Sequence, residues 1–367
     1  MFFIIFLTIY ILANVYIMYR VVHDLNFRGT TAITFLVLYL AITFLSVYSL
    51  KIVRFNQPSI FTKIFTEIGY IWLGFFSISI TYFLLSHLAI IFYSSPKFRY
   101  NITIVTIILI FVSSVYSFLN TCQTPQIKEV KISVPNLFTD KFTIVQLTDI
   151  HIDTATNYYE IKQIVDITNS LNPDIIVFTG DLADTDILKT YKKYGLLDFK
   201  SKYGTFAVSG NHEYYMGITK YETLCKNIKF KLLDNENILV DNKFYVAGIT
   251  DYKTSKQVNY KPADVKKSLE NVDFSKPVIF LSHQPDSFFE AQKFPITIQL
   301  SGHTHAGQIP PFDIIEYFMY KYFYGLYKEK NSYIYVSPGT RWWGPPMRLF
   351  SKSEIVKIIL EKANTVK

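Results

Sequence analysis

Two histidines stand one residue apart in a glycine-bounded stretch, Gly302–Gln308, which reads GHTHAGQ. On a loop that leaves a strand, the glycines allow a sharp turn, so the two imidazoles can face two different centres. Paired histidines can also be plain polar loop residues. Metal binding is favoured here because three further histidines, His151, His212 and His283, stand in comparable short polar segments.

Five polar segments of this kind follow apolar runs that are typical of β-strands. The segments are Thr148–His151, Gly180–Asp181, Gly210–Glu213, Ser282–Gln284 and Gly302–Gln308. The runs before them are Phe142–Leu147, Ile175–Phe178, Phe206–Val208, Val278–Leu281 and Ile296–Leu300. Side chains at the carboxyl ends of successive strands converge on one edge of a sheet. We therefore expect these segments to form a single site.

The segments supply two carboxylates, one amide and four imidazoles: Asp149, His151, Asp181, Asn211, His283, His303 and His305. One metal does not need seven ligands, whereas two divalent metals that share a carboxylate do. Mixed nitrogen and oxygen ligands suit manganese, iron, zinc or cobalt, and the lack of thiolates disfavours a structural zinc site. Two metals about 3.5–4 Å apart can hold a bridging hydroxide and clamp a phosphoryl group during in-line attack.

This ordered set of motifs resembles the calcineurin-like metallophosphoesterase superfamily over roughly residues 140–310. The resemblance implies two divalent metal ions, with manganese favoured and iron, zinc, cobalt or magnesium as alternatives. It implies that Asp149, His151 and His305 hold the first metal, that Asn211, His283 and His303 hold the second, and that Asp181 bridges them. His212 would protonate the leaving oxygen as a general acid, and Glu213 would support His212 or its loop.

The same resemblance implies an α/β fold, a four-layer αββα sandwich, for residues 136–367. Short β-type runs alternate with helical stretches after Pro135, which agrees with an α/β domain. Two further strands are expected at Tyr333–Val336 and Glu354–Leu360. Helices are expected at Tyr158–Leu171, Thr185–Tyr194, Tyr214–Asn227, Pro262–Asn271 and Pro285–Gln292.

The first 121 residues have a different composition, with seven basic and two acidic side chains. A membrane-spanning helix needs about 20 predominantly apolar residues. Four runs without a charged residue approach or exceed this length: Phe2–Tyr19, Thr31–Leu50, Ile68–Tyr93 and Ile102–Leu119. We expect an all-α membrane domain of about four transmembrane helices over residues 1–120, and a polar connector over residues 121–135.

The remaining charges bear on partners and sidedness. The net charge of +8 comes mostly from the loops between the apolar runs, which suits contact with anionic lipid head groups. Basic residues after position 121 are balanced by acids, so nothing indicates nucleic-acid binding. The first and third loops hold four basic residues, Arg20, Arg28, Lys97 and Arg99, against five on the other side, which leans toward a cytoplasmic catalytic domain. Cys122 and Cys225 show neither metal spacing nor a disulfide framework. His87, within the third run, is either functional or hydrogen-bonded inside the helix bundle.

The tail adds two features with open interpretations. Residues 310–327 are rich in Tyr and Phe and could form a core-packing helix, a surface that dips into the membrane interface, or a lid. The stretch Gly339–Arg348, which ends in GPPMR, resembles the tail of the membrane-associated bacterial branch of the superfamily. That branch includes phosphodiesterases and a UDP-2,3-diacylglucosamine hydrolase. Arg341 and Arg348 could each bind a phosphate or form a surface salt bridge.

Together these features predict a membrane-anchored, dinuclear-metal phosphohydrolase that cleaves phosphoester or pyrophosphate bonds of a lipid-linked or nucleotide–glycolipid substrate. One alternative is a general phosphodiesterase for soluble or cell-wall substrates, with the helices as an anchor only. Another is a non-catalytic membrane sensor or scaffold that uses the metal site for binding. The presence of His212 argues against this last reading, because a binding site has no need of a general acid.

Overall fold

The computed structural model describes residues 2–55, 60–135, 137–153 and 156–363, and the chain forms two compact units. The helical unit contains the first four helices and two later segments, Gln308–Ile314 and Gly344–Phe350. The sheet unit contains the chain between Thr124 and Gly307, Ile315–Trp343, and the strand after Ser351. Each unit is described by itself below.

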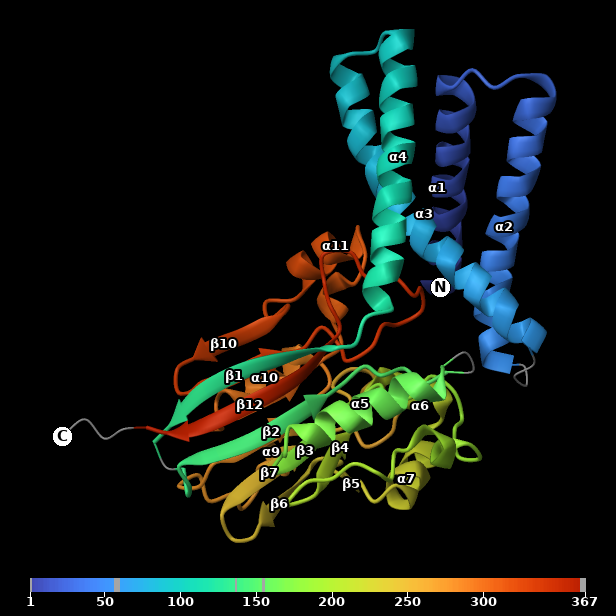
Figure 1. Ribbon diagram of the computed structural model, residues 1–367. Helices are drawn as coiled ribbons and strands as arrows, with labels where there is room; N and C mark the ends of the chain where they lie inside the picture. Colours follow the sequence, from blue (N-terminus) through green and yellow to red (C-terminus); the bar gives the residue numbers. More distant parts are fainter. Residues whose placement is uncertain (1, 56–59, 136, 154–155, 364–367) are drawn as a thin grey trace. The chain divides into compact units, whose positions relative to one another are not determined.

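Four helices in the described part of the chain are long and apolar enough to cross a membrane, as the sequence predicts. They are α1 (Phe2–Asp24), α2 (Gly29–Phe55), α3 (Ile60–Phe92) and α4 (Pro96–Thr121), drawn in blue to green in Figure 1. The helix α4 begins six residues before the apolar run that predicts it, because Pro96 follows an N-cap at Ser95, whose side chain accepts the N–H of Phe98.

Polar side chains inside the helical unit satisfy one another. Tyr39 donates to Asn14 Oδ1 at 2.9 Å, and Tyr10 shares a 2.7 Å hydrogen bond with Ser46. Arg20, which the sequence placed in a loop, lies in α1 and is 1% exposed. Its Nε donates to Asp24 Oδ2 at 2.7 Å. An ion pair inside an apolar bundle has little water to replace a lost partner, so each member depends on the other.

His87 belongs to the same polar network. Its Nδ1 lies 3.0 Å from the hydroxyl of Tyr16, which also accepts from Arg20 at 2.8 Å. The expectation that His87 is hydrogen-bonded within the helices is therefore the one that the structure bears out.

Two segments distant in sequence complete the helical unit. Ile309, Met347 and Leu349 are buried in one apolar cluster with residues of α1, α3 and α4. Ser77 of α3 donates to the carbonyl of Pro310 at 2.6 Å, and Asn120 of α4 donates to that of Arg348 at 2.9 Å. Arg348 is itself fully buried, so the expectation of a surface salt bridge at this position is wrong.

The sheet unit contains two sheets of six strands each among its described residues (Figure 1). The first has the order β1 (Gln126–Val134), β12 (Glu354–Lys362), β2 (Lys141–Leu147), β3 (Ile175–Thr179), β4 (Thr205–Val208) and β5 (Lys231–Leu232). The second has the order β10 (Gly325–Glu329), β11 (Ser332–Val336), β9 (Ile298–Ser301), β8 (Val278–Leu281), β7 (Phe244–Gly248) and β6 (Glu236–Val240). Strands β2 to β5 are parallel, as are β7, β8, β9 and β11.

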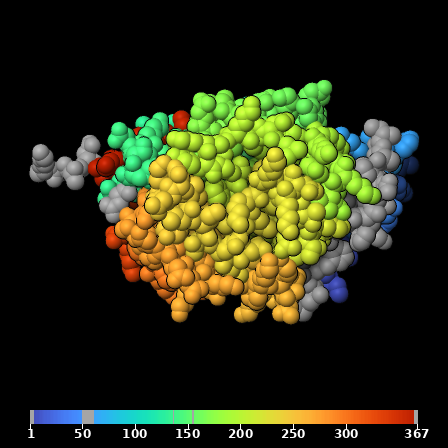
Figure 2. Space-filling model, turned by 90° about the horizontal axis from the view of Figure 1, so that it is seen from below, coloured from blue at the N-terminus to red at the C-terminus, as the bar shows by residue number. Residues whose placement is uncertain are grey.

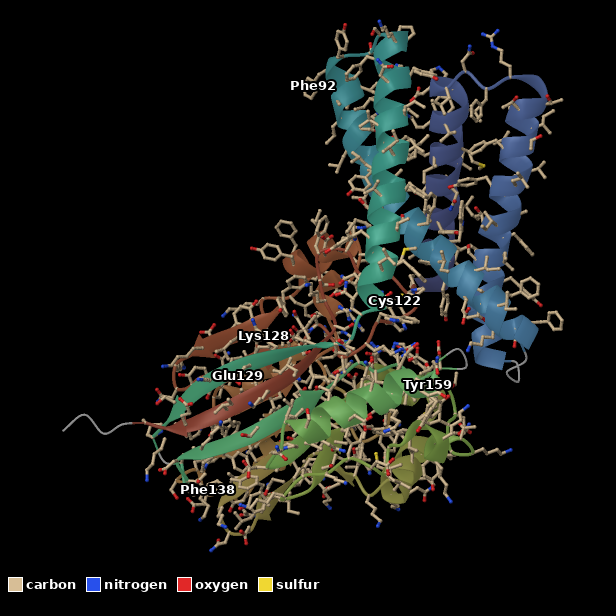
Figure 3. All side chains as sticks on the ribbon, in the orientation of Figure 1. Phe92, Cys122, Lys128, Glu129, Phe138 and Tyr159 are labelled. Atoms are coloured by element: carbon tan, nitrogen blue, oxygen red, sulfur yellow. The ribbon has the colours of Figure 1, made fainter. Side chains whose placement is uncertain are left out.

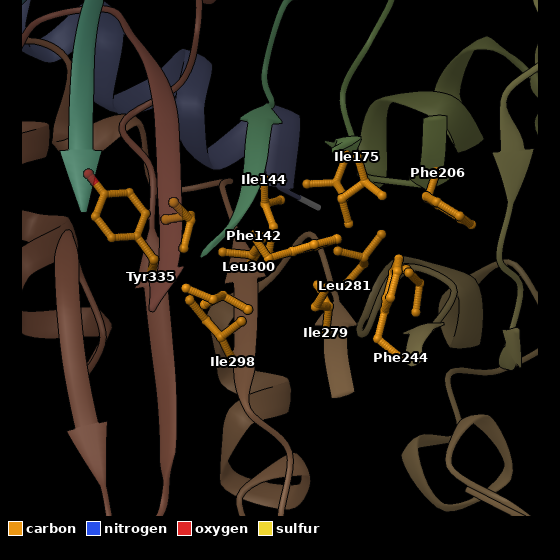
Figure 4. Close-up of a cluster of buried hydrophobic side chains, with 14 of the residues drawn as sticks. Phe142, Ile144, Ile175, Phe206, Phe244, Ile279, Leu281, Ile298, Leu300 and Tyr335 are labelled. Atoms are coloured by element: carbon orange, nitrogen blue, oxygen red, sulfur yellow. The ribbon is translucent and has the colours of Figure 1, made fainter. Parts of the chain in front are cut away.

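Alternating side chains of these strands face two different apolar layers. Phe142 and Ile144 of β2 face the core between the sheets, where they meet Leu281 and Leu300 (Figure 4). Val145, from the same strand, faces the opposite side, which α5 (Tyr158–Ser170) and α7 (Ile218–Asn227) cover. The outer face of the second sheet packs on α9 (Val265–Ser268) and α10 (Phe288–Ala291). The result is the expected four-layer αββα sandwich, one face of which is seen in Figure 2.

Several predicted boundaries change in the structure. The polar segment expected as a connector contains β1, which pairs with β12 along its whole length. The helix expected over 185–194 is only a short 3₁₀ turn, Tyr191–Tyr194, and that over 262–271 is limited to α9. The helix expected over 214–227 is divided into α6 (Asn211–Met216) and α7 at Gly217, whose φ is 110°. The strands expected after Pro135 are all present.

The remaining short helices are α8 (Thr254–Gln257), α11 (Phe312–Met319) and the 3₁₀ turns Pro285–Ser287 and His305–Gly307. Among the described residues of α11, none is buried. The expectation of a core-packing helix in the aromatic segment is therefore wrong for α11.

The Arg20–Asp24 pair yields a test of the helical unit. We expect Arg20→Met and Asp24→Leu each to destabilise the full-length chain by about 3–5 kcal/mol, because each removes the nearest charged partner of a buried charge. The double variant should be less destabilised than either single variant, and Arg28→Met, at an exposed position, should have little effect. Thermal unfolding in detergent checks this. Additive losses in the double variant would show that the two side chains do not depend on each other.

Candidate metal centre

The predicted ligand segments all follow parallel strands. Asp149 and His151 come after β2, Asp181 after β3, Asn211 after β4, His283 after β8, and His303 and His305 after β9. Parallel neighbours within each sheet bring these carboxyl ends to one edge. The sequence argument for a shared site therefore agrees with the observed topology.

The backbone at this edge is unusual. Asp149, His151, Asp181, His303 and His305 all have positive φ values, between 50° and 76°. Residues other than glycine rarely adopt this conformation, and each instance costs of order 1–3 kcal/mol. Backbone hydrogen bonds hold it: Asp149 N–H donates to the carbonyl of Gly180 at 3.1 Å, and His151 N–H to that of Asp181 at 3.0 Å. The ligand loops are thus fixed by their neighbours.

Asp149, His151 and His305 form one buried group of donors. The Nε2 atoms of the two histidines lie 3.1 Å apart, and His305 Nε2 lies 3.3 Å from Asp149 Oδ1. The other ring nitrogen of His151, Nδ1, is 2.7 Å from Asp184 Oδ1. Nε2 of His151 is therefore the atom left for a metal.

The remaining predicted ligands surround His283. Its Nε2 lies 3.2 Å from Asn211 Oδ1, 3.1 Å from His303 Nδ1 and 3.2 Å from Asp181 Oδ2. Its Nδ1 donates to the carbonyl of Thr179 at 2.8 Å, which leaves Nε2 for the site. Asp181 Oδ2 also lies 3.8 Å from His151 Nε2, so this carboxylate stands between the two groups. All seven predicted ligands are therefore brought together.

The donor set and its surroundings fit a pair of divalent metal ions. Oxygen and imidazole donors are the ligands that such ions share. Three glycines leave the space that the ligands occupy. A Cβ on Gly302 would lie 2.1 Å from Asp149 Oδ2, one on Gly210 2.2 Å from Asp181 Oδ1, and one on Gly180 2.7 Å from His283 Nδ1. Only glycine at these positions lets the ligands keep their places.

Charges in the cluster are closely balanced. Burial alone would lower the pKa of His283, but the charge of Asp181 outweighs it and raises this pKa to about 10. Burial and the nearby His283 lower the pKa of His303 to about 3. Although burial opposes it, His283 and His212 hold the pKa of Asp181 well below its ordinary value. Imidazole protons thus neutralise the buried carboxylates, and divalent metals would take over that role as they displace protons.

His212 stands beside the predicted ligands. Its Nδ1 is 2.8 Å from Asp184 Oδ1, and its Nε2 is 3.9 Å from Asp181 Oδ2. The side chain is 15% exposed, so it can reach a molecule that enters the site. With Nδ1 held by Asp184, Nε2 is the atom that faces the predicted metals.

Asp184 is a site residue that the sequence argument missed. One of its oxygens contacts both His151 and His212, and an isolated parallel bridge between Ile152 and Ala183 pairs the two loops at this point. Its position three residues after a predicted ligand, in the same loop, was the available signal.

Glu213 supports the loop. It accepts the N–H groups of Gly210, Asp181 and Leu182 at 2.7–2.9 Å, which is one of the two roles expected for it. Burial, with the nearby charge of Asp181, raises the pKa of Glu213 to about 7.

Three residues of the tail border the site. The hydroxyl of Tyr320 lies 3.1 Å from Nε2 of His303, and the ring of Trp343 lies 5.6 Å from that of His212. Arg341 donates from Nε to Glu160 at 2.8 Å and from a terminal nitrogen to the carbonyl of His151 at 3.2 Å. Arg341 was expected either to bind a phosphate or to form a surface salt bridge. The structure contains an ion pair with Glu160, but the Arg341 side chain is only 6% exposed, so this ion pair is not on the surface.

Comparison with known proteins gives consistent matches. A family model described as calcineurin-like phosphoesterase matches residues 142–307. A Danio rerio transmembrane protein with metallophosphoesterase domain is 33% identical over 285 residues, which cover 74% of this chain and 64% of the relative. An uncharacterized metallophosphoesterase of Campylobacter jejuni is 37% identical over 270 residues, which cover 72% of this chain and 70% of the relative. The aligned part thus spans slightly less than two thirds of the first of these relatives.

The space beside Asp149 yields a test of the metal centre. We expect Gly302→Ala to lower metal affinity by about tenfold or more, the size of effect seen when groups that orient ligands are lost. Gly248→Ala is the control, because its Cβ would also overlap neighbouring side chains, 2.6 Å from Val208 Cγ1, but these side chains are apolar. Elemental analysis of both purified variants would check this. Equal metal content in the two would mean that the Gly302 position does not shape the site.

Asp184 yields a second test. We expect Asp184→Ala to weaken metal binding by about 10–100-fold, because His151 loses the partner that fixes its ring. Asp184→Asn should recover part of the loss, since an amide oxygen can still accept from the two histidines. Asp186→Ala, which removes an exposed partner of Lys220, is the control. Metal titrations of the three variants decide, and wild-type affinity in Asp184→Ala would contradict the assigned role.

Proposed function

The chain belongs to the calcineurin-like phosphoesterase family, and from this premise we propose that it is a metal-dependent phosphoesterase that hydrolyses a phosphoester or pyrophosphate bond of a membrane-embedded, lipid-linked substrate. A nucleotide–glycolipid is one substrate of this class. The observation that carries the proposal is the path of the chain after its last predicted ligand. Gln308, three residues after His305, begins a segment that packs with the apolar helices.

The packing of that segment argues against a merely tethered domain. Ile309 is 4% exposed in the apolar cluster of the helical unit, and Met347 and Leu349, from the second such segment, are 2% and 5% exposed. Both segments adjoin residues of the site, His305 on one side and Trp343 on the other. A helix that served only as an anchor would not require the site loops to fold with it. This arrangement supports a substrate that is itself held in the membrane.

We assign the ligands as the family resemblance implies. Asp149, His151 and His305 would hold one ion, Asn211, His283 and His303 would hold the other, and Asp181 would be shared. Bound divalent ions would supply Lewis acidity toward the phosphoryl oxygens and an activated water. Manganese suits this donor set, as do iron, zinc and cobalt.

His212 is assigned as the general acid. Asp184 accepts the Nδ1 proton and fixes the ring, so Nε2 is the nitrogen that can donate a proton to the leaving oxygen. The same hydrogen bond would stabilise the ring when it is protonated. Trp343, whose ring lies against that of His212 and is 48% exposed, limits the approach of water to one side of the imidazole.

The charge distribution supports a cytoplasmic location of the sheet unit, with four spanning helices. Arg20 is buried in α1 and paired with Asp24, so it does not count as a loop charge. Loops one and three then hold three basic residues, Arg28, Lys97 and Arg99. The opposite side holds Lys51, Arg54 and Lys63, together with Lys128 and Lys131 after α4. The excess on the side of the sheet unit favours the cytoplasm by the positive-inside rule.

Turnover of paired substrates tests this function. In nanodiscs with added Mn²⁺, the full-length chain should hydrolyse a nucleotide–diacylglucosamine with a higher kcat/KM than bis-p-nitrophenyl phosphate. Asp181→Ala should lose both activities together with bound metal. His212→Asn should keep its metal but lose about 10²–10⁴-fold in kcat, the usual contribution of a general acid. A chelator should abolish turnover in every case.

The same experiment separates the alternatives. If only the soluble diester is hydrolysed, and residues 126–367 alone keep full activity, the helices are an anchor and the lipid-linked substrate is wrong. If His212→Asn turns over both substrates at the wild-type rate, the general-acid assignment fails. If the metal-loaded chain hydrolyses neither substrate nor any other phosphoester, the site serves binding alone.

A further inference from the structure

The helix α11 exposes apolar side chains around most of its circumference. Phe318 is 81% exposed, Met319 67% and Tyr317 63%, and Phe312, Ile314 and Ile315 are also exposed. An amphipathic helix in water buries its apolar stripe against the protein. Contiguous exposed apolar surface of this kind marks an interaction site.

The segment just before α11 indicates which environment the exposed apolar side chains of α11 contact. Ile309 is buried in the apolar cluster of the helical unit, and Pro310 accepts a hydrogen bond from Ser77 of α3. The first turn of α11 follows directly, since Phe312 N–H donates to the carbonyl of Ile309 at 3.0 Å. The first turn of α11, up to Ile314, therefore belongs to the helical unit, whose helices are long and apolar enough to span a bilayer.

The length of α3 indicates how deep in a bilayer the contact between Ser77 and Pro310 would lie. Its 33 residues extend about 50 Å at 1.5 Å per residue, whereas the hydrocarbon core is about 30 Å thick. Phe92, labelled in Figure 3, ends the helix, and Ser77 lies about 22 Å from it along the axis. For a straight span perpendicular to the bilayer with Phe92 at one interface, this rise would place Ser77 about 8 Å inside the other. Interfacial helices bury their apolar face by about 5–10 Å.

We propose that α11 is a membrane-contact helix whose apolar side chains, with Phe318 and Met319 foremost, insert into the bilayer surface. The helix contains Asp313 and Glu316 but neither Lys nor Arg. Attraction to anionic lipid therefore contributes little, and apolar burial drives the contact. Burial raises the pKa of Glu316 to about 7, which lowers the cost of bringing this carboxyl close to lipid.

The same helix leads directly to the metal centre, and this part of the inference rests on the proposed function. Tyr320 follows α11 and contacts His303, and it lines a groove of about 890 Å³ together with Tyr317, Phe318 and Met319. Its lining also includes Phe289, two lysines, Lys293 and Lys321, and two acidic residues, Asp286 and Glu290. Aromatic side chains next to polar groups suit an amphiphile, with its chain against the aromatic residues and its phosphate near Tyr320. The groove would thus take lipid phosphoesters from the membrane surface.

A site-specific probe tests the contact without any need for activity. In a Cys122→Ser background of the full-length chain, an environment-sensitive fluorophore is placed at Phe318→Cys or Tyr159→Cys. Tyr159, labelled in Figure 3, is 73% exposed on α5 and is the control. In phosphatidylcholine nanodiscs, acyl-chain nitroxide lipids should remove at least half of the emission at position 318 and little at position 159, whereas aqueous iodide should act mainly at 159.

Each other result overturns the inference. If iodide quenches both positions equally and the lipid nitroxide quenches neither, α11 lies in water. If position 318 is protected from both quenchers, protein covers the helix and a second copy becomes the occupant to test.

A kinetic arm tests the link to the site. Ile315→Asp changes α11 at an exposed position that does not line the groove. It should lower kcat/KM several-fold for a lipid phosphoester in nanodiscs and leave hydrolysis of bis-p-nitrophenyl phosphate unchanged. Equal losses on both substrates would make the effect structural and overturn the link. Because the quenching result stands even if the chain hydrolyses neither substrate, failure of the proposed function is distinguishable from failure of the membrane contact.

Discussion

Charge balance among buried groups is the constraint on which the sheet unit depends. Asp149 and Asp181 are buried and Asp184 is half-buried at the edge of two sheets, in a place where an unneutralised carboxylate is costly. Imidazoles from loops after four different strands surround them. The attraction holds these loops together only if each donor keeps its position, because small shifts would leave a buried charge unpaired. The fold therefore has to hold the loops in position before attraction between these charges can stabilise it.

The two sheets fix the loops through backbone rather than side chains. Positive φ values at five predicted ligands are strained, and the hydrogen bonds from Asp149 and His151 to the next loop hold them in place. Gly180, Gly210 and Gly302 remove the Cβ atoms that would displace a ligand. Strain and missing side chains both weaken a protein locally. Their concentration at one edge indicates that the site, and not stability, determines the sequence there, and bound metal would restore part of the loss.

Features that depend on neighbouring residues in the sequence could be predicted, whereas features that depend on contacts between distant residues could not. The ligands could be predicted because each stands directly after an apolar run, and the four long helices because about 20 apolar residues in succession have few other uses. Asp184 and Tyr320 were not assigned to the site, because they contact histidines that only the folded chain brings near. In the sequence, β1 looks like a polar connector, because Lys and Glu residues are interspersed with its apolar residues. Ile309, Met347 and Leu349 were not linked to the helices, since nothing local distinguishes them from core residues of the sheet unit.

Those three residues bear on whether the helices are only an anchor. If the helices were only an anchor, the catalytic part would be complete without them. Its apolar residues would be buried in its own core and its polar residues would be exposed. Here Ile309, Met347 and Leu349 are buried in the apolar cluster of the helical unit, so removing the helices would expose these apolar side chains. The segment from His305 to α11 illustrates the consequence. It begins at a predicted metal ligand, passes through the apolar cluster of the helices, and returns through an exposed apolar helix to Tyr320 at another ligand, His303. A chain that follows this path joins the ligand loops to the helical unit directly along the backbone, and this continuity is the basis for proposing a substrate that the membrane holds.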